Sequence, residues 1–501
     1  MKVKTPLLIT LLFLGVQLFG VSGALLDVAR AAPAMPVTVA PTRAALTPRA
    51  GGQMREFRLT ASAMTYEFVK GQPTTAWAYN NQVPGPELRV REGDLVRVIF
   101  TNNLPEPTTI HWHGVNVPTS MDGVPDISQP PVRPGGTFTY EFIATPAGTR
   151  WYHAHFAEHK QLQLGLYAPL IIEPRDVNTR YDRDYTITFG EWSADALHPD
   201  HNQPNGGMGN MMSDDMMGDD MMSTPDDPNV IFTVNGKASP VATRLLVRQG
   251  ERVRLRFINA SAIQKHVIRL EGHTMKITHV DGNPLLPPRE VDAIEIGTGE
   301  RYDVEVTANN PGVWALHCVR PGHAERGLKT LVRYEGAADD SRESADTRNT
   351  RRFRVWPDTI LSQRQAAGET TRPDKQFQLT LSGGMMMDGM MGGDDASNTW
   401  TINGKAYPNT DPLVVKQGDR VRVQLFNMSM EDHPMHLHGH SFAVLQYDGR
   451  PITPMVRDTV TLRHMESYDI EFVADNPGTW FFHCHNAEHM EGGLITLVKY
   501  Q

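Results

Sequence analysis

The sequence predicts an all-β protein built from three related Greek-key β-sandwich domains. Three observations support this: a pair of short strands occurs three times, a second motif follows each copy, and glycine and proline turns separate the strands. Apolar residues in these segments alternate every second position, which is the period of a strand and not of a helix. The length of 501 residues leaves room for several domains.

The first repeated element is a short alternating strand, a glycine turn and a second alternating strand. Its copies read LRVREGDLVRVIFTN, LLVRQGERVRLRFIN and LVVKQGDRVRVQLFN. The turns fall at Gly93, Gly250 and Gly418. The density of valine, isoleucine and threonine around them favours strands over helices.

The second repeated element reads PAGTRWYHAHFAEH, NPGVWALHCVRPGH and NPGTWFFHCHNAEH. The copies recur about every 160 residues, which indicates three tandem domains. We expect domains at residues 51–175, 176–334 and 352–501, with a polar linker at 335–351.

The N-terminus predicts export. Lys2 and Lys4 precede an apolar run that begins at Leu7, and small residues follow, so residues 1–32 read as a secretory signal peptide. The alternative is an uncleaved anchor, since apolar residues continue to Leu26. We expect a periplasmic or extracellular protein with no stable membrane insertion after cleavage. A net charge of -9 without a basic patch argues against a nucleic-acid partner.

Four histidine clusters carry the chemistry. They are His111-Trp112-His113, His153-Ala154-His155, His433-Pro434-Met435-His436-Leu437-His438, and His483-Cys484-His485 followed by His489. Side chains two residues apart on a strand share a face, so each His-X-His aims two imidazoles at one point. A closed zinc site uses about four ligands, far fewer than these clusters offer. Imidazoles combined with one thiolate favour copper.

Cys484 faces away from its two neighbouring histidines, so one strand can serve two metal centres. His433, Cys484 and His489 supply the two imidazoles and one thiolate of a blue-copper site. The axial position falls at Leu494, which cannot coordinate, so we expect a trigonal site of relatively high reduction potential.

At these motifs (HWHG, WYHAH, HPMHLHG and HCHNAEHMEGGL) the chain resembles the multicopper oxidases, a family that includes laccases, cuprous oxidases and copper-resistance oxidases. The resemblance implies three cupredoxin-like domains and four copper ions. It implies a type 1 copper on His433, Cys484 and His489, and a type 2 copper on His111 and His436. The type 3 pair would be held by His113, His153, His155, His438, His483 and His485.

The resemblance further implies that four one-electron oxidations at the type 1 copper reduce dioxygen to two waters at the trinuclear cluster. Asp122, eleven positions after His111, matches an acidic residue of the family that is linked to proton transfer, although a turn residue before Gly123 is the alternative. Met490 stands where some bacterial members carry a glutamate, which leaves the second proton route open.

Two methionine-rich insertions, at residues 206–222 and 383–395, precede the similar segments FTVNGKA and WTINGKA. Their methionines are Met208, Met211, Met212, Met216, Met217, Met221, Met222, Met385, Met386, Met387, Met390 and Met391. Thioethers suit Cu(I), so we interpret both insertions as loops that capture or deliver cuprous ion. The alternative is a solvated low-complexity insertion.

The second domain carries Cys318 with His323 at the spacing of Cys484 and His489, and His266 aligns with His433. These three residues form a candidate second type 1 site, which would hold a fifth copper. Arg269 and Glu271 replace the trinuclear histidines there, so the alternative is a remnant with a buried thiol.

The leading hypothesis is therefore a monomeric, exported oxidase that uses dioxygen and oxidises Cu(I), small aromatic reductants or both. The methionine runs favour Cu(I) and a role in copper tolerance. The alternative is a non-enzymatic copper-sequestering protein on the same scaffold.

Overall fold

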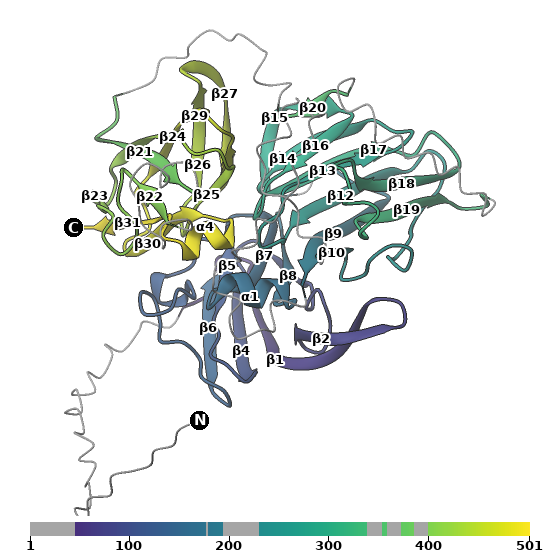
Figure 1. Cartoon of the computed structure of the whole chain (residues 1–501), viewed down its shortest axis with the longest axis horizontal. Helices are drawn as coiled ribbons and strands as arrows, with labels where there is room; N and C mark the ends of the chain where they lie inside the picture. Colours follow the sequence, from purple (N-terminus) through teal and green to yellow (C-terminus); the bar gives the residue numbers. More distant parts are fainter. Residues whose placement is uncertain (1–45, 177–178, 194–229, 338–352, 358–371, 385–398) are drawn as a thin grey trace, which may run out of the picture. The chain divides into compact units, whose positions relative to one another are not determined.

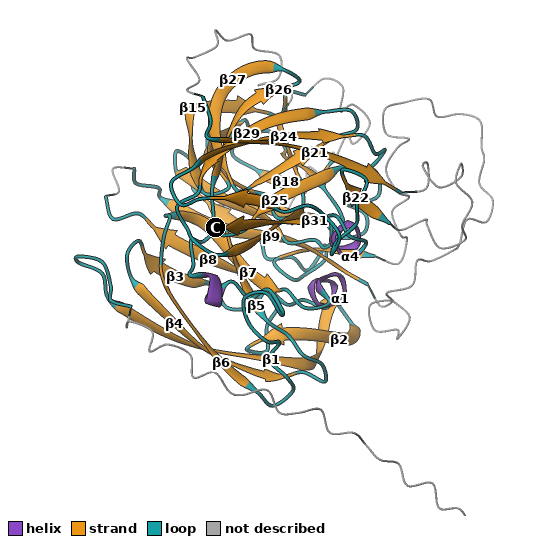
Figure 2. Ribbon diagram, turned by 90° about the vertical axis from the view of Figure 1, so that its left-hand side faces the viewer, coloured by secondary structure: helices purple, strands orange, loops and turns teal. Residues whose placement is uncertain are grey.

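The computed structural model describes residues 46–176, 179–193, 230–337, 353–357, 372–384 and 399–501. The expected signal peptide, all twelve methionines of the two insertions and residues 338–351 of the expected linker lie outside these ranges. Nearly all regular structure within them is β-strand (Figure 2), which confirms the all-β prediction. No helix in the described part is long and apolar enough to cross a membrane.

The first domain pairs two four-stranded sheets, ordered β2-β1-β4-β6 and β3-β8-β7-β5 (Figure 1). Its strands are β1 (Met54–Val69), β2 (Gln72–Tyr79), β3 (Leu88–Arg91), β4 (Leu95–Asn103), β5 (Ile110–His113), β6 (Thr137–Ile143), β7 (Gly148–Ala154) and β8 (Tyr167–Glu173). A 3-10 turn, η1 (Thr119–Met121), follows β5, and helix α1 (Glu158–Gln163) follows β7.

The second domain has two six-stranded sheets, ordered β10-β9-β12-β17-β14-β15 and β11-β19-β18-β13-β16-β20. Its strands are β9 (Arg183–Trp192), β10 (Ile231–Val234), β11 (Leu245–Val247), β12 (Arg252–Asn259), β13 (His266–Leu270), β14 (Met275–Val280), β15 (Asn283–Val291), β16 (Ala293–Ile296), β17 (Arg301–Thr307), β18 (Val313–Cys318), β19 (Lys329–Tyr334) and β20 (Val355–Trp356).

The third domain has sheets ordered β22-β21-β24-β29-β26-β27 and β23-β31-β30-β25-β28. Its strands are β21 (Lys375–Gly383), β22 (Trp400–Ile402), β23 (Leu413–Val415), β24 (Arg420–Asn427), β25 (His433–Leu437), β26 (Phe442–Tyr447), β27 (Arg450–Arg457), β28 (Thr459–Leu462), β29 (Ser467–Val473), β30 (Thr479–Cys484) and β31 (Ile495–Tyr500). Helix α4 (Ala487–Glu491) connects β30 to β31.

The repeated strand pair has the same place in all three domains. Its first strand joins one sheet and its second strand joins the other, so the glycine turn carries the chain across the sandwich. Gly93, Gly250 and Gly418 have φ of 81°, 88° and 92°, a region that disfavours residues with a Cβ. The glycine therefore permits the abrupt change of direction between the sheets.

One boundary differs from the sequence-based division. Strand β20 pairs in parallel with β16, so Val355 and Trp356 extend a sheet of the second domain although the sequence placed them in the third. Trp356 is fully buried, and its indole nitrogen donates to Tyr302 at 3.2 Å. A two-residue strand is too short to show a period, so pattern alone could not assign it.

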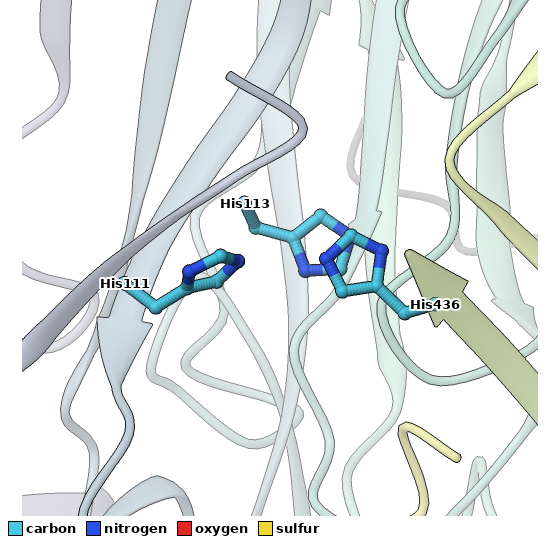
Figure 3. A group of neighbouring side chains, drawn as sticks. All are labelled: His111, His113 and His436. Atoms are coloured by element: carbon cyan, nitrogen blue, oxygen red, sulfur yellow. The ribbon is translucent and has the colours of Figure 1, made fainter. Parts of the chain in front are cut away.

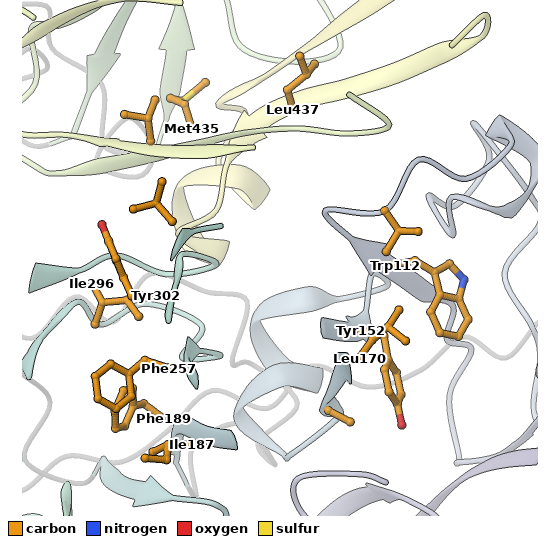
Figure 4. Close-up of a cluster of buried hydrophobic side chains, with 14 of the residues drawn as sticks. Trp112, Tyr152, Leu170, Ile187, Phe189, Phe257, Ile296, Tyr302, Met435 and Leu437 are labelled. Carbon is orange, nitrogen blue, oxygen red and sulfur yellow. The ribbon is translucent and has the colours of Figure 1, made fainter. Parts of the chain in front are cut away.

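The core follows the alternation read from the sequence. Figure 4 shows buried side chains of the first domain (Trp112, Tyr152), the second (Phe257, Tyr302) and the third (Leu437 among them). Trp112 lies on β5 between His111 and His113, and Tyr152 lies on β7 directly before His153, with the two ring centroids 5.5 Å apart. Their burial places the neighbouring imidazoles on the opposite face of the sheet.

Candidate metal centres

Two pairs of neighbouring strands position the histidine clusters. In the first domain β5 pairs with β7, and His111 lies opposite His153. In the third domain β25 pairs with β30, and His436 lies opposite His483. Each His-X-His thus faces a second one across a strand pair, and the first and third domains contribute four imidazoles each.

The eight imidazoles meet in three groups. Within each group the ligand atoms lie within 4.8 Å of one another, and every member is buried. The groups are His111 with His113 and His436 (Figure 3), His113 with His153 and His485, and His155 with His438 and His483. Each group combines ligands from both domains, so the centre exists only where these domains meet.

Hydrogen bonds fix which nitrogen of each ring faces inward. The outer nitrogens donate to oxygens that can only accept: His111 Nδ1 to the Asp122 carbonyl (2.8 Å), His153 Nδ1 to the Ala154 carbonyl (2.9 Å), His436 Nδ1 to the Asp458 carbonyl (2.9 Å) and His483 Nδ1 to the Cys484 carbonyl (2.9 Å). The inner nitrogen of a neutral ring then carries a lone pair.

Several inner nitrogens are buried with no hydrogen-bond partner among the described residues. They are Nε2 of His111, His153, His155, His436 and His485, and Nδ1 of His113. Leaving a buried polar atom unsatisfied costs about 1–3 kcal/mol, so this set calls for a cation. Neutral imidazole nitrogens are the ligands that copper favours, and the residues present therefore fit copper.

Burial also keeps these imidazoles neutral. Desolvation lowers the pKa of His113 far below its usual value, and the neighbouring His436 lowers it further. Desolvation lowers the pKa of His155 and of His485 to about 3. Rings that stay unprotonated at neutral pH are ready to bind a metal.

Asp122 lies inside this centre and not in an exposed turn. It is 1% exposed, its Oδ2 accepts from His438 Nδ1 at 2.9 Å, and its Oδ1 lies 3.3 Å from His111 Nδ1. The carboxylate therefore touches one histidine from each domain. Met490, the residue that left the second proton route open, packs against apolar Val124 and Phe481.

Glu158 is a functional candidate that the sequence analysis missed. It begins helix α1, is 1% exposed, and its carboxylate oxygens lie 3.6 Å from His155 Nε2 and 4.0 Å from His485 Nε2. Desolvation raises its pKa well above the usual value, and Glu491 raises it further. The shared AEH spacing aligns Glu158 with Glu488, but this alignment does not indicate that Glu158 lies beside the histidines.

A buried ion network joins all three domains behind the histidines. The Asp458 carboxylate binds Arg301 of the second domain through two bonds of 2.6 and 2.5 Å, and Arg150 of the first at 3.3 Å. Its Oδ1 also lies 3.2 Å from His113 Nε2. Removing one partner of such a buried group leaves an uncompensated charge, so this network fixes how the domains dock.

The third domain holds a separate trio of His433, Cys484 and His489. The Cys484 sulfur lies 3.6 Å from His433 Nδ1 and 3.7 Å from His489 Nδ1, and the two nitrogens are 3.0 Å apart. Leu494 is fully buried and its carbonyl accepts from the Cys484 N–H at 3.0 Å. Burial raises the pKa of the Cys484 thiol, so a thiolate there needs a bound cation.

Two neighbours orient the imidazoles of this trio. The hydroxyl of Ser429 lies 2.6 Å from His433 Nε2, which leaves Nδ1 toward Cys484. The Trp400 ring lies 3.9 Å from the His489 ring and covers it. Asn427 positions the serine, because its Oδ1 accepts from the Ser429 N–H at 2.9 Å.

The second domain builds the corresponding trio from His266, Cys318 and His323, all buried. The two Nδ1 atoms lie 3.1 Å apart, and the Val267 N–H donates to the Cys318 sulfur at 3.3 Å. The trinuclear positions differ, as expected: Glu271 lies 3.1 Å from His317 Nε2 and pairs with Arg269 at 3.0 Å.

Known proteins are similar to this chain over most of its length. Three family models, each described as multicopper oxidase, match residues 60–177, 183–337 and 377–501. The multicopper oxidase MmcO of Mycobacterium tuberculosis is 33% identical over 86% of this chain and 84% of its own. Copper resistance protein A of Pseudomonas syringae pv. tomato is 27% identical over 89% of this chain and 92% of its own.

Solved structures are similar as well. The crystal structure of a multi-copper oxidase from Pseudomonas thermotolerans superposes with a TM-score of 0.67 at 29% identity, covering 90% of this chain and all of the other.

Proposed function

The chain belongs to the multicopper oxidase family, and from that premise we propose that it couples four one-electron oxidations of Cu(I) or of phenolic substrates to the reduction of dioxygen to water. The observation that carries the proposal is the group of eight buried imidazoles, six of which have an inner nitrogen with no hydrogen-bond partner among the described residues. Such a preorganised set suits metal ions that must bind without rearrangement.

We assign the ligands residue by residue. His433, Cys484 and His489 would hold the type 1 copper, His111 and His436 the type 2 copper, and the six remaining imidazoles the type 3 pair. When bound, these coppers would take single electrons from the substrate and deliver four of them to dioxygen. The absent thioether at Leu494 favours a high potential at the type 1 site.

Cys484 forms the path between the two centres. It lies between His483 and His485, and its carbonyl accepts from His483 Nδ1 at 2.9 Å, which adds a hydrogen bond to the covalent route. Electrons that enter at the Cys484 thiolate would therefore have a covalent route and a hydrogen-bonded route to the eight-imidazole centre.

Reduction of dioxygen to water also consumes protons, and we propose that two carboxyl groups beside the imidazoles transfer them. Asp122 Oδ2 accepts from His438 Nδ1, and the raised pKa of Glu158 keeps a proton on its carboxyl among His153, His155 and His485. We propose that Glu158 of the first domain takes the role of the glutamate that some bacterial members of the family carry at the position of Met490.

Cu(I) is the preferred substrate in this proposal. The second methionine run ends at Met391, nine positions before Trp400, whose ring covers His489. A run of thioethers this close in the sequence to Trp400 would bind a soft cation such as Cu(I). We propose that the protein is exported to the periplasm or to the outside of the cell. There it would oxidise Cu(I) and so contribute to copper tolerance.

The first experiment measures oxygen uptake by the copper-loaded protein with Cu(I) and with a phenol. We expect four electrons consumed per dioxygen and no hydrogen peroxide. His153→Gln should abolish uptake with both substrates. His273→Gln, which alters a second-domain histidine bonded to Tyr334, is the matched control and should retain it. Copper binding without oxygen uptake would favour the sequestering protein instead.

A second experiment separates the substrates. Shortening both methionine-rich insertions should raise the KM for Cu(I) and leave phenol oxidation unchanged. If Cu(I) oxidation also survives unchanged, the methionines do not serve the substrate.

A further inference from the structure

We propose that the second domain binds a fifth copper, held as Cu(I), between His266, Cys318 and His323. The proposal goes beyond the oxidase function and does not rest on it, because its ligands are distinct from those of the other centres. The three ligand atoms lie within 4.8 Å of one another in a fully buried site. A thiolate with two imidazoles is a soft donor set that suits copper.

The trio is already arranged as a ligand set. The Nδ1 atoms of His266 and His323 face each other at 3.1 Å, nearly the separation of 3.0 Å between the corresponding atoms of the third domain. The Val267 N–H points at the Cys318 sulfur at 3.3 Å, a bond that favours the thiolate form.

The surroundings of the trio repeat those of the third domain. The Ser261 hydroxyl lies 2.9 Å from His266 Nε2 and directs Nδ1 inward, as Ser429 does for His433. The Phe232 ring stacks on His323 at 4.4 Å, in the position of Trp400. Leu328 is fully buried at the axial position, so the site is trigonal like its counterpart.

Arg320 is where the two sites differ. Its Nε donates to His323 Nε2 at 3.3 Å. A guanidinium can only donate, so Nε2 must carry the lone pair and Nδ1 the proton. A metal on Nδ1 requires the opposite tautomer. Arg320 must therefore leave when the ion binds, which its half-buried position allows; in the third domain Asn486 takes this place and caps α4.

Burial of the site selects the oxidation state. A thiolate with Cu(I) forms a neutral site, whereas Cu(II) would leave a net positive charge in a fully buried site. An uncompensated charge in a poorly solvated interior is strongly unfavourable, so the site favours Cu(I). Because Arg320 must also be displaced from His323, the site binds Cu(I) more weakly than the third domain does.

The test counts copper in the purified, copper-loaded protein. Cys318→Ser should lower the content by one ion per chain relative to the wild type. A Cys318→Ser protein that still shows the Cys484 charge-transfer absorbance has a folded third domain, so its lower count then reports the second domain. An unchanged copper count in that protein overturns the proposal.

Arg320→Ala provides an independent measurement. In a Cys484→Ser background, competition with a chromophoric Cu(I) chelator should show about tenfold tighter binding after Arg320→Ala, the lower end of the range for groups that support a metal ligand. Arg326→Ala is the matched control, because Arg326 lies over the Phe232 ring at 4.7 Å and its Nε donates to the Gly322 carbonyl. Equal affinities in both arginine variants would refute the tautomer argument. The Cu(I) affinity is measured in the Cys484→Ser protein without any oxidase turnover. Failure of this test can therefore be told apart from failure of the proposed oxidase function.

Discussion

The second and third domains build the same trio of two histidines and a cysteine, and they differ in what stands beside the cysteine. Cys484 lies between His483 and His485, whereas Cys318 lies between His317, which contacts Glu271, and Val319. Each trio is formed within a single domain, where a serine, an aromatic ring and a short helix or turn position its ligands. The eight-imidazole centre is formed by the first and third domains together, because each of its groups contains histidines from both.

Cys484→Ser should have the largest effect, because it removes the residue that we propose joins the two centres. If the third-domain cysteine connects the two centres, its loss should reduce oxidation of both substrates by more than about 100-fold, beyond the usual effect of altering groups that support a ligand. The measurement is kcat for Cu(I) and for a phenol, with copper content as a check. Retained turnover with either substrate would mean that electrons enter elsewhere.

Acid should affect both trios alike in the copper-free protein. Desolvation lowers the pKa of His433 to about 3 and that of His266 far below its usual value. The unfolded chain therefore binds protons that the folded chain does not. Stability is complete above about pH 6.5 and falls toward pH 3, by about 1.4 kcal/mol per pH unit for each such histidine.

Chemical denaturation at pH 7 and pH 5 tests this. His433→Gln and His266→Gln should each remove one histidine's share of the pH dependence. Clearly unequal changes would show that the two trios are not equally desolvated.

The serines give a smaller and more specific effect. Ser429→Ala and Ser261→Ala each remove the hydroxyl that orients a trio histidine, at 2.6 and 2.9 Å. We expect about tenfold weaker copper binding in the corresponding domain, measured by chelator competition, and partial rescue by threonine. A Ser429→Ala protein with unchanged affinity would show that packing alone orients His433.

The smallest effect concerns the contact between the two domains. Lys265, beside His266, pairs with Asp432, beside His433, with both side chains about a quarter exposed. Lys265→Met should lower the free energy of unfolding by about 1 kcal/mol, the upper range for a partly exposed pair. Lys405→Met, which removes a more exposed pair with Asp411 inside the third domain, is the control and should change it less.

The sequence predicted the parts of the molecule that depend on local spacing. Alternation identified the strand pairs around Gly93, Gly250 and Gly418, and the His-X-His spacing identified the imidazoles that share a face. The period of a strand does not say which sheet it joins, so the crossing at each glycine and the placement of Val355 were not predictable.

Residues that act across domains were the hardest to predict. Asp458 is unremarkable in the sequence, yet its carboxylate meets Arg150, Arg301 and His113 from the other two domains. Glu158 becomes a candidate only when α1 is seen to bring it between imidazoles of two domains. Such roles depend on tertiary contacts that no local pattern encodes.

The bond from His438 to Asp122 joins residues 316 positions apart in the chain. Closing a loop of that length costs conformational entropy, and contacts of such long range form late in folding. The imidazole centre is therefore assembled last, after the sandwiches that carry its halves. We expect it also to be the first part lost on heating, because separation of the first and third domains would divide its ligand groups while the strands stay paired. Thermal inactivation should accordingly precede the loss of β-sheet circular dichroism.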